Sequence, residues 1–125
     1  RVSATYDDVG RQVIWPYQVR DLISTARLQL TTGTEGTLLA GAASTFHDLV
    51  YVMGANQSDA AVDIDFRDQT GGNIVFSLTI PAASTAGVAP VVPIPQNEAA
   101  AAWTADMGDI TGTTVNLSAL FIKNV

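Results

Sequence analysis

The sequence predicts an all-β protein, a jelly-roll-like antiparallel β-sandwich of about eight strands with an extended N-terminal arm. Two runs in which every second residue is apolar, 62–67 and 74–80, flank a turn that contains Gly71 and Gly72. Successive side chains of a strand point to opposite faces, so each run buries one face. Adjacent glycines adopt positive φ at little cost, which favours a hairpin here. Its expected inner face consists of Val62, Ile64, Phe66, Ile74, Phe76, Leu78 and Ile80.

Turn-forming residues separate the other apolar segments at intervals of about eight to twelve residues, which is typical of a sandwich or jelly roll. The segment 46–53 is apolar on both faces in its second half, as expected in the middle of a sheet or at an interface. We expect the alanine-rich segment 99–107 to form a strand rather than a helical turn. The further expected strands are 28–31, 37–40, 88–95 and 114–123.

Two of these segments indicate their position in a sheet. Segment 88–95 contains Pro90, Pro93 and Pro95, which have no backbone N–H to donate, so it is either an edge strand or an extended polyproline-like segment. In segment 114–123 alternate residues form one apolar face. We expect this last strand to pair near the middle of a sheet.

Residues 1–27 are interpreted as an N-terminal docking arm, followed by a sandwich domain of residues 28–125. The arm shows no sustained apolar period, although 12–15 fits a short strand and 17–26 fits a helical turn or two. Its many apolar residues favour docking, either across its own sandwich or onto a neighbouring subunit. The alternative is an ordinary first strand followed by a connector. The chain begins at Arg1 rather than at methionine, which would follow if a preceding segment were cleaved or omitted.

The composition points to a surface that is covered in part by other subunits. Charged residues make up 14% of the 125 residues, and Lys123 is the only lysine, whereas ordinary soluble domains contain about 25% charged residues. Depletion of charge marks interface cores; the alternative is a hydroxyl-rich surface on an isolated β-protein. The chain has no cysteine, which excludes disulfides and thiolate metal sites and fits a reducing cytosol. It shows neither a membrane-spanning apolar run nor a signal-peptide pattern.

The net charge of −6 argues against partners that carry phosphate. Nucleic acid is bound by clustered lysine and arginine, and no such cluster occurs here; anionic membranes are disfavoured for the same reason. The charge is unevenly distributed. Residues 1–27 hold four arginines and three aspartates, a net charge of +1, whereas residues 28–125 hold two basic and nine acidic residues, a net charge of −7.

No catalytic motif is recognisable. His47 is the single histidine, and Asp48, its neighbour on a strand, would point to the opposite face and could not orient it. The sequence contains neither a Gly-x-Ser-x-Gly motif nor a phosphate-binding glycine loop. We therefore expect no enzymatic activity and no cofactor.

Two sets of residues suggest a binding site but also have simpler interpretations. A group of aspartates suggests calcium, but it lacks EF-hand spacing and fits the solvated face of a strand, with Arg67 offsetting part of the charge, so no metal is expected. The group consists of Asp59, Asp63, Asp65 and Asp68. A second set, of aromatic residues, would suit a sugar-binding platform but is more typical of core and interface positions. That set consists of Trp15, Tyr17, Tyr51 and Trp103.

The whole chain resembles the small jelly-roll virion proteins of tailed bacteriophages, of the capsid decoration or head-fibre type. The resemblance concerns the general character of the segments and their order along the chain rather than an invariant catalytic motif. The segments that carry it are 10–24, 46–68, 71–82, 91–106 and 112–125. It implies a non-enzymatic virion protein on the particle surface, assembled in the host cytoplasm, and a homo-oligomer, typically a trimer. The implied partners are other copies of the chain and the major capsid protein or another virion protein.

The sequence therefore predicts a capsid decoration protein that binds the capsid lattice or neighbouring subunits through its arm. The alternative is a carbohydrate- or receptor-binding module of a phage tail or fibre. Contacts with other subunits are expected in the arm and on the outer face of the second hairpin strand, where charge is sparse. The expected contact residues are Arg11, Val13, Ile14, Trp15, Tyr17, Arg20, Val75, Ser77 and Thr79.

Overall fold

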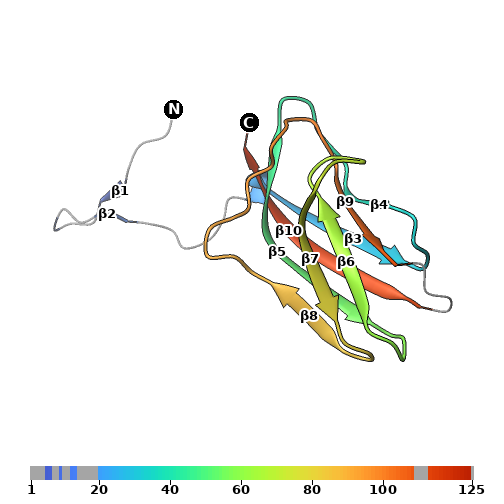
Figure 1. Ribbon diagram of the computed structural model, residues 1–125. Helices are drawn as coiled ribbons and strands as arrows, with labels where there is room; N and C mark the ends of the chain where they lie inside the picture. The colour runs from blue at the N-terminus through green and yellow to red at the C-terminus, as the bar shows by residue number, and fades with distance from the viewer. Residues whose placement is uncertain (1–4, 7–8, 10–11, 14–19, 109–112, 125) are drawn as a thin grey trace.

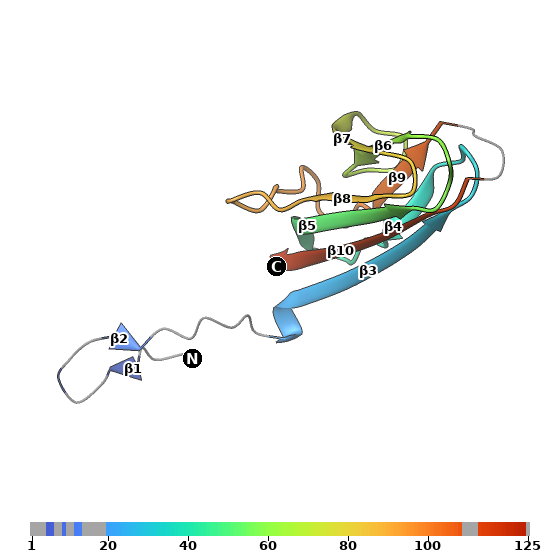
Figure 2. The same ribbon diagram turned by 90° about the horizontal axis from the view of Figure 1, so that it is seen from below.

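The computed structural model describes residues 5–6, 9, 12–13, 20–108 and 113–124, and it shows two four-stranded antiparallel sheets packed face to face (Figures 1 and 2). The strand orders are β3-β10-β5-β8 and β4-β9-β6-β7. The predicted antiparallel β-sandwich is thus confirmed. The strands are β3 (Ile23–Leu30), β4 (Gly36–Leu39), β5 (Phe46–Asn56), β6 (Val62–Arg67), β7 (Ile74–Ile80), β8 (Thr85–Val88), β9 (Trp103–Met107) and β10 (Val115–Asn124).

A small ribbon precedes the sandwich. It consists of β1 (Thr5–Tyr6) and β2 (Gln12–Val13), which pair antiparallel, and Figures 1 and 2 show it apart from both sheets. A short 3-10 helix, η1 (Arg20–Leu22), leads directly into β3. Strand β3 therefore begins inside the segment that was assigned to the arm. Among the described residues no helix is long and apolar enough to cross a membrane.

The last strand lies inside its sheet, as expected. Strand β10 pairs with β3 on one side and with β5 on the other, and its alternate residues from Val115 to Phe121 are buried. These residues face the other sheet, where Ile64, Phe66 and Trp103 are fully buried. Each strand buries one face because its apolar residues recur with a period of two.

The hairpin of β6 and β7 is confirmed, but its predicted inner face is wrong at one position. Phe66 pairs with Phe76 and Arg67 pairs with Ile74, so Val75 is an extra residue on β7. Such a bulge reverses the side-chain alternation beyond it. Ile74 consequently points away from the core and is 49% exposed. Strand β7 is also an edge strand rather than a central one.

Two other expected strands differ in the structure. The segment 88–95 does not form the expected continuous strand, since β8 ends at Val88, before the prolines, and Ile94 then forms a single bridge with Leu49. Strand β9 starts only at Trp103, because the chain turns at Ala100, whose φ is +63°. Both differences leave the segment between β8 and β9 as a long connection across the end of the sandwich.

Gln96 ties this connection to the sandwich, and its side chain is 4% exposed. Its Oε1 accepts the backbone N–H of His47 at 2.7 Å. Its Nε2 donates to the carbonyl oxygens of Asp68 at 3.1 Å and Ala101 at 2.7 Å. One buried amide therefore satisfies backbone groups from three segments that are distant in sequence, which buried polar groups require.

We expect Gln96→Ala to lower the free energy of unfolding by about 2–4 kcal/mol, because it leaves one buried donor and two acceptors without a side-chain partner. Equilibrium urea unfolding measures this change. The matched control is Gln57→Ala, since the Gln57 side chain is exposed; equal losses in the two variants would contradict the role assigned to Gln96.

Candidate interaction surfaces

The outer face of the β4-β9-β6-β7 sheet is polar and mostly acidic. Arg67 Nη1 lies 2.9 Å from Asp106 Oδ1. Thr104 Oγ1 donates to Glu35 Oε2 at 2.5 Å, and the Gly71 N–H donates to the same carboxylate. The hydrogen bond from Thr104 and then that from Gly71 lower the pKa of Glu35, and the hydrogen bond with Asp106 raises the pKa of Arg67.

Two of the predicted contact residues belong to this polar face. Ser77 Oγ donates to Asp65 Oδ1 at 2.5 Å, and Thr79 Oγ1 donates to Asp63 Oδ1 at 2.7 Å. Both hydroxyls are thereby engaged within the hairpin, in cross-strand pairs that stabilise a sheet. Val75 lies on the same strand and is 38% exposed. The three residues share one edge strand, but the acidic residues beside them keep this side solvated.

The remaining predicted contact residues lie in the arm. Val13 belongs to β2 and pairs with Thr5, and Arg20 opens η1. The other four lie outside the described residues: Arg11, Ile14, Trp15 and Tyr17.

The aspartates considered for calcium do not gather at one point. Asp63 and Asp65 accept hydroxyl hydrogen bonds from β7, whereas Asp68 accepts the N–H of Asn97 at 2.9 Å and thereby holds the loop before β9. Within the described part of the chain, no three His, Cys, Asp or Glu side chains are close enough together to hold a metal ion.

The aromatic residues considered for sugar binding are also separated. Trp103 is fully buried, its Nε1 donates to the carbonyl oxygen of His47 at 2.7 Å, and its ring packs against Phe121. Tyr51 instead lies half-buried on the outer face of β5. Trp15 and Tyr17 lie outside the described residues. Trp103 is therefore a core residue and is not available to a ligand.

The outer face of the β3-β10-β5-β8 sheet has the opposite character. Among the described residues of its strands, only Arg27 and Asp48 place a formal charge on this face. Between and around them lie apolar side chains that are partly or largely exposed. They are Ile23, Phe46, Val50, Tyr51, Met53, Leu120 and Ile122.

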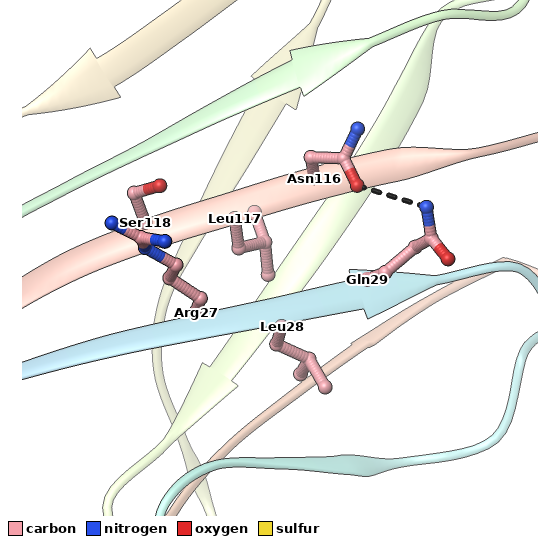
Figure 3. Close-up of a pocket in the computed structure, with 6 residues that line it drawn as sticks. All are labelled: Arg27, Leu28, Gln29, Asn116, Leu117 and Ser118. Atoms are coloured by element: carbon pink, nitrogen blue, oxygen red, sulfur yellow. Dashed lines mark hydrogen bonds between the residues drawn. The ribbon is translucent and has the colours of Figure 1, made fainter.

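A shallow hollow of about 310 Å³ lies on this face between β3 and β10 (Figure 3). Gln29 Nε2 donates to Asn116 Oδ1 at 3.1 Å at one end of it. Arg27 pairs with Ser118 one row further along, and Figure 3 shows their side chains together. A second hollow of about 290 Å³, lined by Tyr51, Met53 and Val88 among others, lies beside β8. Neither hollow contains a constellation of residues for catalysis.

The sequence contains a signal for the apolar outer face of the β3-β10-β5-β8 sheet, although its apolar side chains are not among the predicted contact residues. Segment 46–53 is apolar on both faces in its second half, and Leu120 and Ile122 interrupt the polar side of the last strand. Apolar residues on both faces of a strand in a two-layer sandwich leave one set uncovered.

Comparison with known proteins gives no family for this chain. No family model matches the sequence, and no curated protein matches it. The fold is similar to that of a chain in the cyanophage Pam1 capsid asymmetric unit, with a TM-score of 0.50, 11% identity, and coverage of 97% of this chain and 99% of that one. At this identity the likeness concerns the fold alone.

A protein of Bacillus endospore appendages, which form a novel family of disulfide-linked pili, superposes less well. The TM-score is 0.45 at 16% identity, with coverage of 83% of this chain and 90% of that one. This superposition is too poor to support an inference.

His47 is a core residue, and its side chain is 3% exposed. Its ring meets Phe121 edge-on with the ring centroids 6.4 Å apart, and its Nδ1 has no hydrogen-bond partner among the described residues. Burial, and to a smaller extent Lys123, lower the pKa of the imidazole. The folded state therefore favours the neutral ring.

Stability is expected to decrease as the pH falls below about 6.5, because the unfolded chain then binds a proton at His47 that the folded chain does not. Urea unfolding at pH 7.5 and pH 5.5 measures the difference. His47→Phe should flatten the dependence. An unchanged slope in this variant would show that other groups cause it.

Proposed function

We propose that this chain is a non-enzymatic structural protein of a virus particle, and specifically a capsid decoration protein of a tailed bacteriophage. The observation that carries the proposal is the contrast between the two sheet faces. One face has charged and hydroxyl side chains in cross-strand pairs, while the other has exposed apolar side chains and, among the described residues of its strands, only Arg27 and Asp48 as charges. A protein held in a lattice needs one surface suited to neighbours and one suited to solvent.

The N-terminal segment supports the same role. The β1–β2 ribbon lies apart from the sandwich in Figures 1 and 2, and all eight sandwich strands begin at or after Ile23. A segment attached to a folded body adds avidity, because its contact forms with a partner already held nearby. Residues 1–27 carry a net charge of +1 and residues 28–125 carry −7. Acidic surfaces of the capsid or of a neighbouring copy are thus the proposed targets of the arm.

The proposed partners are the major capsid protein, or another virion protein, and further copies of this chain. The similarity of fold to a chain of a cyanophage capsid structure is consistent with this role. The resemblance of the sequence to small jelly-roll virion proteins of tailed bacteriophages is consistent with the same role.

The test is binding to particles. Particles purified on a density gradient and lacking this protein are mixed with the full chain, and co-sedimentation is measured. Saturable binding at a fixed number of copies per particle is expected, and failure to bind would overturn the proposal.

Removal of residues 1–19 separates the arm from the sandwich without cutting into η1 or β3. We expect this variant to fold and to lose at least about tenfold in affinity for particles. A chain whose residues 1–19 are scrambled in order controls for length and charge. Binding of the truncated chain at full affinity would show that the arm is not the attachment device.

A further inference from the structure

We infer that two copies of this chain pair through the outer face of the β3-β10-β5-β8 sheet, about a two-fold axis at Leu120, with Arg27 of each copy bound to Asp48 of the other. This inference rests on the proposed function in one respect, since it names the surface through which the proposed subunit meets its own copies.

The first argument is the apolar character of the face. Met53 is 46% exposed and Phe46 is 38% exposed. Leu120 and Ile122 on β10 are half-buried, and Tyr51 pairs with Leu120 from the adjacent strand. These side chains form a continuous surface across neighbouring strands rather than isolated exposed residues. Contiguous apolar surface of this kind marks sites of association.

The second argument is the placement of the two charges. Arg27 on β3 pairs with Ser118, and Asp48 on β5 pairs with Ile122. Leu120 lies midway between Ser118 and Ile122 on β10, the strand between β3 and β5. Arg27 and Asp48 therefore lie at opposite ends of a diagonal whose midpoint is Leu120.

This placement makes the face complementary to itself. When two copies face each other about a two-fold axis that lies in the interface and crosses the diagonal at a right angle at Leu120, each Arg27 comes to lie over the other copy's Asp48. Both ion pairs form at once, which is the condition for an isologous contact. With strands about 4.8 Å apart and residues about 3.4 Å apart along them, the strands of the two copies cross at roughly 70°. That angle is close to the orthogonal class of sheet packing.

The environments of the Asp48 and Arg27 side chains favour such a contact. Asp48 is held in place, because its Oδ1 accepts the N–H of Gln96 at 3.0 Å and its Oδ2 accepts a hydrogen bond from Asn124. These neutral donors orient the carboxylate without neutralising its charge. Arg27 is exposed and has no ion-pair partner among the described residues. The oriented Asp48 carboxylate and the Arg27 guanidinium lie on one nearly uncharged face. This arrangement favours the binding of a second copy over that of an unrelated partner.

The two-fold contact yields a dimer, not the trimer that the family resemblance implies. Charge reversal tests it, with the mass in solution measured by sedimentation velocity. We expect the wild-type chain to be a dimer, and Arg27→Asp and Asp48→Arg each to dissociate about tenfold more readily, because every contact then joins like charges. Glu98→Arg, an exposed reversal outside this face, is the control and should remain a dimer.

Mixing the two reversed variants provides the decisive result. In the mixture Asp at position 27 of one chain meets Arg at position 48 of the other, and the second contact is the native one. A heterodimer should therefore form although each variant alone is dissociated. The Arg27 side chain forms no hydrogen bond or ion pair among the described residues, so Arg27→Asp keeps the test valid if Asp48→Arg unfolds. A monomeric wild-type chain, or undiminished pairing of Arg27→Asp, would overturn the inference.

A cysteine at the axis gives an independent measurement, since the chain has no cysteine of its own. Leu120→Cys places two thiols opposite each other, and a short bismaleimide should link them into a dimer. Val75→Cys, on the outer face of the other sheet, is the matched control and should not be linked. Linkage at position 75 but not at 120 would refute the assigned face.

Particle binding without pairing would overturn only this inference, and pairing without particle binding would overturn only the proposed function.

Discussion

The placement of β10 between β3 and β5 is the constraint on which the rest of the structure depends. Its inward residues, from Val115 to Phe121, complete the core against Trp103 and Phe66. Its pairing with β3 joins residues about 90 positions apart, from Val115 with Leu30 to Ile122 with Ile23. The entropy of closing such loops is lost before the contacts form, so this sheet is completed only when the end of the chain is present.

Fixing the inward face of β10 also fixes its outward face. Asn116, Ser118, Leu120 and Ile122 must form one row, because strand side chains alternate. The opposite sheet carries rows of Asp, Ser and Thr that pair with one another. Hydrogen bonds within that sheet reduce the gain from binding a partner there, whereas exposed leucine, methionine and tyrosine gain free energy from any contact that removes water. The two sides of one sandwich thus differ in what they can bind.

The sequence was sufficient for the features that follow from period-two alternation. The hairpin at Gly71 and the inward face of β10 required only local patterns. The hydrogen bonds of the Gln96 side chain to His47 and Asp68 were not predictable, because these residues lie 49 and 28 positions away in the sequence. Nor did local pattern show that Ser77 and Thr79 would be engaged by aspartates, since that depends on the exact pairing of two strands.

The candidate interface depends on a β-bulge in β5, which no local sequence pattern predicts. Leu120 pairs with Tyr51 and Phe121 pairs with Leu49, so Val50 is an extra residue on β5. If Val50 instead took a regular position in the strand, strict alternation from the buried Val52 would turn Asp48 inward and His47 and Leu49 outward. The extra residue reverses that order, so that His47 and Leu49 enter the core and Asp48 reaches the outer face. The charge symmetry about Leu120 therefore depends on this bulge, because a regular strand with the same sequence would turn Asp48 towards the core.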